Sequence, residues 1–518
     1  MAKMIFKKSL FFAIFLSGFL TWGNARAACV WDNNTCAVST CNYSSLGNEI
    51  AEIKTNSLGK VGAVTIQCPA ETAINTVDLT FSMTTGFSGI NELIIRGAGV
   101  EQTRGSAGQT TLSGGSMIIT STADKKIRIT NFTFAGACND EWQAAAFIRM
   151  NGLTRYSSGG GYRVDHNTLA EDLGRFFYCA DGAYGLIDAN NGIMTDQFSS
   201  FEDAGSYGNE AWTSGASLGS VDANYLENNE LIYENRVFAE ELRMFADDAQ
   251  GGRVVVRYNT LTDFYIGGHD AGSNFRGGLQ YEIYNNKLTS DRSYGAGLMT
   301  LRGGTGVVYN NDMFHLVDTP FAPSTSSGIH LKNVRSTDGG TGGVLPSPWN
   351  TEEDADEFVW CGDTDVKRCL GSSSNSFDKC TSDSDCGGTA GSCVDVDGNI
   401  GTSYPCRDQI GTGNNAYPQD SKPFLFWNNK VIRSTNDPID SPPYIFSGAS
   451  TIAIDRDYCT NSTTMPAICN GVATTYVEFT CPHPLTELSG SCNSSVAGTE
   501  GYVVDVVAPA SPTGLAVS

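Results

Sequence analysis

Short stretches in which apolar and polar residues alternate recur along most of the chain, separated by Gly, Asn and Asp. A period of two is typical of β-strands with one buried face, and the 3.6-residue period of amphipathic helices is nearly absent. Glycine supplies 58 of the 518 residues, in keeping with many tight turns. The pattern therefore predicts an all-β protein made of many short strands.

Seven of these stretches share the pattern apolar-x-apolar-x-Asn-x-apolar, with Asn131, Asn167, Asn235, Asn259, Asn286, Asn311 and Asn429. The intervals from Asn235 to Asn311 are 24, 27 and 25 residues, which is the length of one solenoid coil. Asn tolerates left-handed corners, and its amide both donates and accepts, so stacked Asn side chains can bond to one another. We predict a right-handed parallel β-helix, a solenoid. A series of unrelated hairpin turns is the alternative.

The N-terminus predicts secretion. Lys3, Lys7 and Lys8 precede an apolar run at 9–20, and Ala25-Arg26-Ala27 forms a cleavage pattern, so 1–27 is expected to be a signal peptide. No later stretch is long and apolar enough for insertion into a membrane. We expect a secreted protein that is extracellular or on the cell surface.

All 16 cysteines follow the signal peptide, and an even number in an oxidising compartment indicates disulfides. Their clusters suggest local pairs among Cys29, Cys36, Cys41 and Cys68; between Cys138 and Cys179; among six from Cys361 to Cys406; and among Cys459, Cys469, Cys481 and Cys492. The formal charge of −23 argues against nucleic acid and anionic lipid as partners. It is compatible with neutral glycans, cation-bridged acidic glycans or simple solubility.

Several segments resemble secreted proteins of the pectate-lyase-like superfamily. NELIIRGAGVEQT at 91–103 resembles one of their early coils, and GGRVVVRYNTLTD, RGGLQYEIYNNKL and LRGGTGVVYNN resemble coils of bacterial right-handed parallel β-helix repeat proteins. YPCRDQIGTG and PHPL are similar to segments of the same proteins. The resemblance spans roughly residues 60–490 and implies the fold, whereas the activities within this superfamily are diverse.

The expected organisation follows the repeats and the cysteine clusters. We predict a signal peptide (1–27), an N-terminal cap (28–60), a β-helix body (61–340), a Cys-rich insertion (341–418), the last coils (419–454), a disulfide-held C-terminal cap (455–495), and a linker entering a fibronectin type III-like module (496–518).

Candidate chemistry is concentrated in the central coils. Lyases of the resembled superfamily neutralise a uronate carboxylate with a cation or Arg and remove a proton with a base. The candidate catalytic residues are Arg276, Arg302, His269 and Asp270, although the two arginines could instead bond turn carbonyls. The candidate substrate contacts are Arg253, Glu282, Tyr265 and Tyr281. Asp247 and Asp248 are candidate ligands for Ca²⁺, because that ion prefers carboxylate oxygens.

These residues predict a polysaccharide-binding protein. If it is an enzyme, we expect a polysaccharide lyase acting on a uronate-containing glycan first and a glycoside hydrolase second. The alternative is a non-catalytic extracellular adhesin or matrix protein. The oligomeric state does not follow from the sequence.

Overall fold

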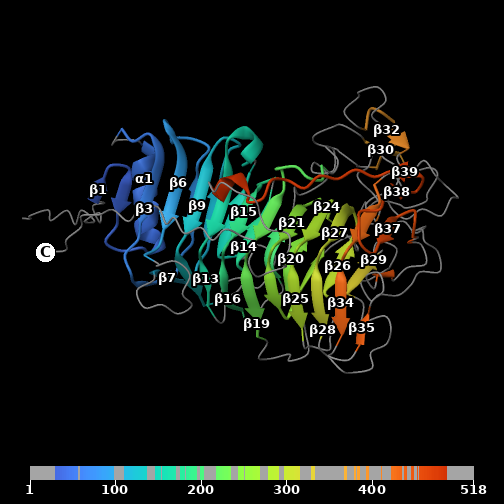
Figure 1. Ribbon diagram of the computed structural model, residues 1–518. Helices are drawn as coiled ribbons and strands as arrows, with labels where there is room; N and C mark the ends of the chain where they lie inside the picture. The colour runs from blue at the N-terminus through green and yellow to red at the C-terminus, as the bar shows by residue number, and fades with distance from the viewer. Residues whose placement is uncertain are drawn as a thin grey trace, which may run out of the picture.

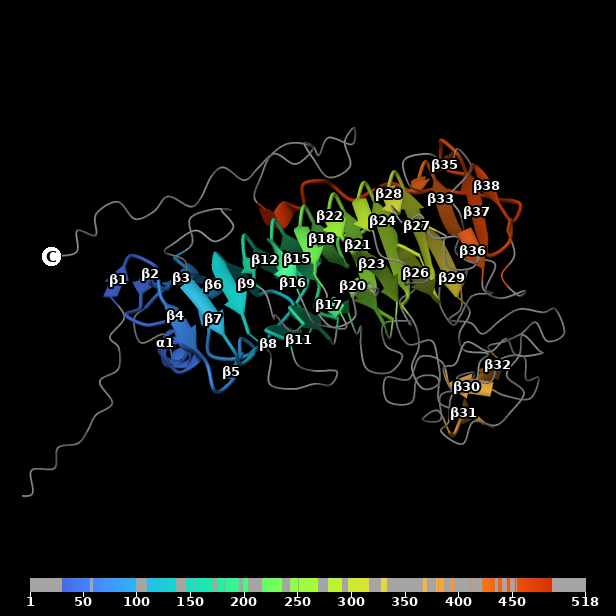
Figure 2. The ribbon, with the colours of Figure 1, turned by 90° about the horizontal axis from the view of Figure 1, so that it is seen from below.

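The computed structural model describes residues 30–486, apart from gaps in the connecting loops that are longest within 333–421. Three parallel sheets, which we call A, B and C, extend along the molecule, and the chain visits them in turn (Figures 1 and 2). Most strands pair in parallel with the strand one coil before and one coil after, whereas β1 and β35, at the ends of sheets A and B, pair antiparallel with β2 and β34. The predicted parallel β-helix is therefore confirmed, and the alternative of unrelated hairpins is wrong.

Sheet A contains β1 (Val30–Asp32), β2 (Thr35–Ala37), β3 (Gly62–Gln67), β6 (Ile90–Arg96), β9 (Lys126–Thr130), β12 (Gly161–Asp165), β15 (Gly185–Asp188), β18 (Asn224–Glu227), β21 (Arg253–Arg257), β24 (Gln280–Tyr284), β27 (Thr305–Tyr309), β33 (Phe424–Trp427) and β37 (Tyr458–Asn461). Sheet B contains β4 (Thr72–Ile74), β7 (Thr110–Ser113), β10 (Phe132–Ala135), β13 (Thr168–Leu169), β16 (Asn191–Met194), β19 (Glu230–Tyr233), β22 (Thr260–Thr262), β25 (Lys287–Ser290), β28 (Asp312–His315), β34 (Lys430–Arg433) and β35 (Asp437–Ile439).

Sheet C contains β5 (Leu79–Ser82), β8 (Met117–Thr120), β11 (Ile148–Asn151), β14 (Phe177–Cys179), β17 (Ser199–Asp203), β20 (Arg243–Asp248), β23 (Phe264–Gly268), β26 (Met299–Arg302), β29 (Ile329–Lys332) and β36 (Ile445–Ser447). Outside these sheets lie the small antiparallel sheet of β30 (Lys367–Cys369), β31 (Lys379–Cys380) and β32 (Cys393–Asp395), and the hairpin of β38 (Ile468–Cys469) and β39 (Val472–Ala473).

The corner between sheets A and B is built from two successive residues. The first takes the left-handed conformation, as Asn285 does with φ 57° between β24 and β25. The second, Asn286, places its amide in the stack: its backbone N–H and Nδ2 both donate to Asn311 Oδ1, at 3.1 and 2.9 Å. Its Nδ2 also donates to the carbonyl of Val256 in the preceding coil. One corner thus satisfies the backbone groups that strand pairing leaves open.

These corners form one asparagine ladder. Its members are Asn167, Asn190, Asn229, Asn259, Asn286, Asn311 and Asn429, each donating to the Oδ1 of the next. Asn311 and Asn429 are 118 residues apart in sequence yet bond directly, at 3.1 and 2.8 Å. The residues between them therefore leave the ladder continuous.

Two of the predicted ladder positions are wrong. Asn131 is displaced by one residue: it takes the left-handed position (φ 63°), and Phe132 follows it with its N–H donating to Asn167 Oδ1. Asn235 lies outside the described residues, and Asn229 occupies the ladder between Asn190 and Asn259. The error arose because the apolar alternation next to Asn235 belongs to β19 of sheet B, whereas the ladder follows strands of sheet A.

Alternate side chains of all three sheets point into one shared core, for example Val254 and Val256 of β21. At the N-terminal end the helix α1 (Tyr43–Thr55) covers this core with Leu46, Ile50 and Ile53. None of the helices among the described residues has the length and apolar character needed to cross a membrane.

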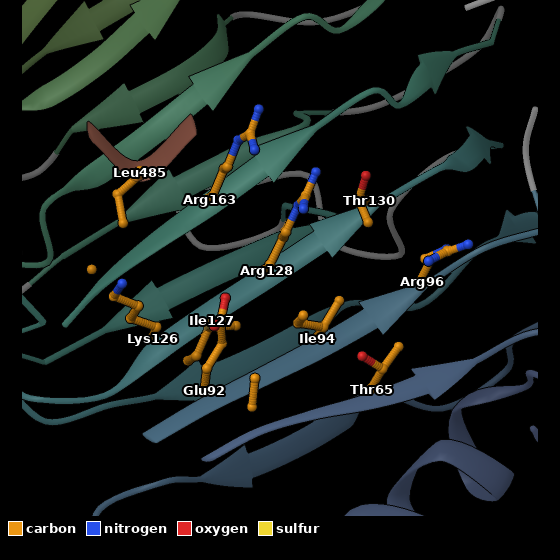
Figure 3. A pocket seen from close by; sticks show the side chains of 12 residues that line it. Thr65, Glu92, Ile94, Arg96, Lys126, Ile127, Arg128, Thr130, Arg163 and Leu485 are labelled. Carbon is orange, nitrogen blue, oxygen red and sulfur yellow. The ribbon is translucent and has the colours of Figure 1, made fainter. Parts of the chain in front are cut away.

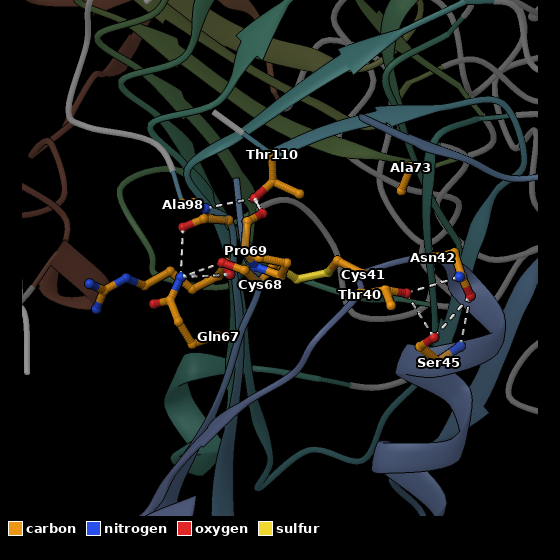
Figure 4. The surroundings of a disulfide bond; sticks show 12 residues. Thr40, Cys41, Asn42, Ser45, Gln67, Cys68, Pro69, Ala73, Ala98 and Thr110 are labelled. Carbon is orange, nitrogen blue, oxygen red and sulfur yellow. Dashed lines mark hydrogen bonds between the residues drawn. A yellow bond between two sulfur atoms is a disulfide. The ribbon is translucent and has the colours of Figure 1, made fainter. Parts of the chain in front are cut away.

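The helix α1 is fixed to the first coil at its N-terminus. Asn42 caps it by accepting from the Ser45 N–H at 2.9 Å. The disulfide Cys41–Cys68 then joins the residue before this cap to the end of β3 (Figure 4). Cys459 and Cys469 form a second disulfide near the other end. The predicted bond between Cys138 and Cys179 is wrong, because Cys179 is a free, buried thiol that faces Asp203.

Candidate functional site

The outer face of sheet A is covered over much of its length by the segment Thr474–Thr486, which we call the strap. The hairpin β38–β39 reverses the chain, and the strap runs back along the sheet toward β12 (Figure 1). Its contacts follow the strands in order: Tyr476 with Glu282 of β24, Phe479 and Thr480 with Arg257 of β21, His483 with Glu227 of β18, and Thr486 with Arg163 of β12.

A buried ion pair anchors the middle of the strap. Arg257 and Glu227 are both fully buried, and Arg257 Nε donates to Glu227 Oε1 at 2.7 Å. The two terminal nitrogens of Arg257 donate to the carbonyls of Phe479 and Thr480, at 2.8 and 2.9 Å. The strap therefore supplies acceptors that the guanidinium would otherwise lack once it is out of water.

Next to Leu485 and Thr486, the last described residues of the strap, the outer face of sheet A contains a cavity of about 240 Å³ that we call the basic groove. It lies over β3, β6, β9 and β12, and Figure 3 shows its lining side chains rising from these neighbouring strands. Its charged residues are four basic and one acidic: Arg96, Lys126, Arg128, Arg163 and Glu92. A chain that is strongly acidic overall thus gathers four basic side chains at one site, where Asp165 and Asp188 offset the charges of Arg128 and Arg163.

Two buried carboxylates, Asp165 and Asp188, fix the positions of Arg128 and Arg163. Arg128 binds it through Nε and Nη2, at 2.8 and 2.5 Å, while Arg163 binds Asp188 in the same way at 3.0 and 2.8 Å. Burial opposes ionisation of Asp165, but Arg128 and Arg163 outweigh it and hold its pKa well below the ordinary value. His166 adds a further contact, Nδ1 to Asp165 Oδ2 at 2.7 Å. The arginines of the groove are therefore fixed in position before any ligand arrives.

One guanidinium nitrogen remains for a ligand. Arg128 uses only Nε and Nη2 for Asp165, and no described residue accepts a hydrogen bond from its Nη1. Its side chain keeps 16% of its surface exposed, against 4% for Arg163. Together with Lys126 and Arg96, this arrangement suits an anionic group with oxygen acceptors, because planar guanidinium donors match carboxylates.

No family model, curated protein or solved structure matches this chain.

Three of the residues predicted from sequence lie near one another on the outward side of sheet C, where Asp247 is itself buried at 1% exposure. Asp247, Tyr265 and Arg302 lie on the adjacent strands β20, β23 and β26. Burial raises the pKa of Tyr265, and Asp247 raises it further, while Arg302 and Arg243 lower it. These charges are thus close enough to act on one another. His269, Asp270 and Arg276 fall in 269–277, outside the described residues, so their roles stay predictions.

The predicted Ca²⁺ pair does not converge. Asp247 and Asp248 are adjacent in β20, and neighbours on a strand face opposite sides. Asp248 belongs to the inward column with Cys179 and Asp203, and Asp247 to the outward one with Tyr178 and Glu202. In the part of the chain that the structure describes, no three His, Cys, Asp or Glu side chains form a group able to hold a metal ion.

Three residues predicted to contact substrate are buried, so these predictions are wrong. Tyr281 lies in the central core with no exposed surface. Glu282 faces outward but lies beneath the strap, where Tyr476 Oη donates to it at 2.6 Å and burial raises its pKa to about 6. Arg253 is 5% exposed and does not line the basic groove. These side chains hold the fold together and do not face a ligand.

The basic residues of the groove were not among the site residues predicted from sequence, although the repeat pattern contained a signal for two of them. Counted back from the corner, Arg128 lies four residues before Phe132 and Arg163 four before Asn167. Both therefore belong to one outward column of sheet A, and the register pairs them directly. Aligning each coil on its ladder position would have shown two consecutive arginines in that column.

Asp248 leads to a prediction about pH. It is fully buried, it accepts no hydrogen bond from a described residue, and a Cβ on Gly252 would touch its Oδ1 while lying 2.9 Å from Asp203 Cγ. Burial, followed by the charges of Asp203 and Asp247, raises its pKa well above the ordinary value. The folded state thus favours the protonated acid, so the contribution of Asp248 to the free energy of unfolding is highest in acid and falls as pH rises from the ordinary toward the raised pKa.

Asp248→Asn removes the cost of ionising or protonating this buried acid, so it is expected to stabilise the protein at pH 8 by at least ~1 kcal/mol, since a pKa difference of one unit corresponds to about 1.4 kcal/mol, with little gain at pH 4. Thermal unfolding measured at both pH values tests this. Asp312→Asn is the control, because Asp312 makes only an exposed ion pair with Lys430 and should change stability by less than about 1 kcal/mol. An equal gain at both pH values would contradict the assignment of the proton to Asp248.

Proposed function

We propose that the protein is a secreted, polysaccharide-binding β-helix protein and that the basic groove binds an acidic, uronate-containing glycan. The single observation that carries this is the gathering of Arg96, Lys126, Arg128 and Arg163 in one open cavity of a chain with a net charge of −23. Neighbouring strands of sheet A are ~4.8 Å apart, so basic side chains on successive strands form a regular row. Such a row suits a polymer whose negative charges also recur at regular intervals. A uronate polymer supplies one carboxylate on each sugar.

Lys126 is the best residue with which to test the groove. Replacing Arg128 would leave the buried Asp165 without its main partner and so confuse binding with stability. Lys126→Glu is expected to weaken binding of a uronate polymer about tenfold, or ~1.4 kcal/mol. Calorimetric titration at low salt measures this, and raising the salt should weaken binding of the parent protein because exposed charges are screened.

Lys430→Glu is the matched control, since it makes the same change of charge at an exposed position of sheet B. It should bind like the parent protein, and a neutral polymer should not compete. Equal binding of neutral and acidic polymers, or equal affinities of Lys126→Glu and Lys430→Glu, would refute the proposal.

Cleavage of the glycan is the second candidate, and the position of Tyr265 and Arg302 on adjacent strands of sheet C, next to the buried Asp247, supports it. An acid, a phenol and a guanidinium are groups that β-elimination of a uronate can use. Absorbance of unsaturated product, followed in the same titrations, detects this reaction, and Arg302→Ala should abolish it. Binding without product supports the non-catalytic alternative, an adhesin or matrix protein.

A further inference from the structure

The basic groove is bounded at one end by the strap. Leu485 lines the cavity beside β12, and a Cβ on Gly161 would lie 3.2 Å from Leu485 Cδ1. Arg163 Nη1 donates to the carbonyl of Thr486 at 3.5 Å, so the strap reaches the last strand of the groove. Figure 3 shows Leu485 beside Arg163 at one side of the cavity and Thr65 at the opposite side.

The opposite end of the groove has only small side chains. Ala63 and Thr65 of β3 line the cavity there. On the next strand, β2, Thr35 is the register partner of Thr65, and Ala37 follows two residues later on the same face. All four positions lack a side chain long enough to close the cavity, so among the described residues nothing blocks the groove at the end formed by β2 and β3.

The strap itself shows how this face holds an extended chain. Its contacts pass from Glu282 to Arg257, Glu227 and Arg163 in the order of their strands, so it runs along the coil stack and across the strands. On the same outer face of sheet A, the column that contains Arg163 continues through Arg128 to Ile94. A ligand lying in the groove therefore follows the line of the strap and meets Leu485 at its inner end.

We infer that the basic groove takes the end of an acidic glycan chain and not an internal stretch, an inference that rests on the proposed function. Four strands spaced ~4.8 Å apart span about 14 Å, the length of about three sugar units at roughly one unit per strand. The terminal sugar lies against Leu485, the following units lie over Arg128, Lys126 and Arg96, and the rest of the chain leaves over Thr65.

A length series of uronic-acid oligomers, from one to eight units of one linkage, tests this with the full chain. Affinity measured by calorimetry is expected to rise up to about three or four units and then to stay constant. The number of protein molecules bound per polymer chain should be the same for long and short polymers, because each chain has one end of the right polarity. Affinity that keeps rising, or stoichiometry that grows with length, would overturn the inference while leaving the proposed function intact.

Two variants separate the possible failures. Thr65→Trp fills the open end and is expected to move the plateau to a shorter oligomer, with the affinity for one or two units unchanged. Lys126→Glu should weaken binding of every oligomer of two or more units. If Thr65→Trp weakens the binding of oligomers of every length equally, the glycan does not leave the groove over Thr65, and its proposed direction is wrong. If no oligomer and no polymer binds the parent protein, the proposed function itself fails.

Discussion

Replacing Asn286 by alanine is expected to lower the free energy of unfolding by about 3–5 kcal/mol, since it leaves several buried polar groups unpaired at 1–3 kcal/mol each. Asn286 Oδ1 accepts from both the backbone N–H and Nδ2 of Asn259, and Asn286 Nδ2 donates to Asn311 Oδ1 and Val256 O. The side chain has no exposed surface, so water cannot replace these bonds. Denaturant unfolding monitored by circular dichroism measures the loss.

The neighbouring corner residue supplies the matched control. Asn285 takes the left-handed conformation, which costs an L-residue without local polar contacts about 1–2 kcal/mol. Asn285→Ala should therefore destabilise by that smaller amount, and Asn285→Gly should be close to neutral because glycine adopts a positive φ freely. If Asn286→Ala costs no more than Asn285→Ala, the ladder does not stabilise the coil stack.

Replacing Arg257 by methionine is expected to release the strap from sheet A and to destabilise the protein by about 3–5 kcal/mol, because it leaves Glu227 buried without its partner. The change also removes the donors to the carbonyls of Phe479 and Thr480. Amide hydrogen exchange should become faster in Thr474–Thr486, and proteases should cut there.

The double variant Arg257→Met with Glu227→Met separates charge from packing. It removes both buried charges together, so it should recover part of the lost stability. Hydrogen exchange in the strap that stays as slow in Arg257→Met as in the parent protein would contradict the anchoring role of this ion pair.

The sequence predicts the coil because local patterns encode it. In β21 of sheet A, for example, the inward residues Val254 and Val256 are apolar, and the corner asparagine Asn259 follows three residues after Val256. The ladder was misassigned at Asn131, which lies one residue before the ladder position, and at Asn235, because Asn229 holds the place between Asn190 and Asn259. Alternation with a period of two reveals which strands exist, but it does not fix which sheet a strand joins.

The basic groove and the strap depend on contacts that no local pattern encodes. Arg128 and Asp165 are 37 residues apart, and Arg163 and Thr486 are 323 apart. Tyr281 and Glu282 looked like candidate sugar contacts because they are polar and central in sequence. Their burial follows from the core and from the returning strap, which become visible only when the chain is folded.

Hydrogen exchange with and without a uronate oligomer tests the location of the binding site most directly. We predict that the ligand slows exchange in β6, β9 and β12 of sheet A, and that Lys126→Glu removes this protection. Protection confined to β20, β23 and β26 of sheet C, around Asp247 and Tyr265, would contradict binding in the basic groove and would place the site on sheet C.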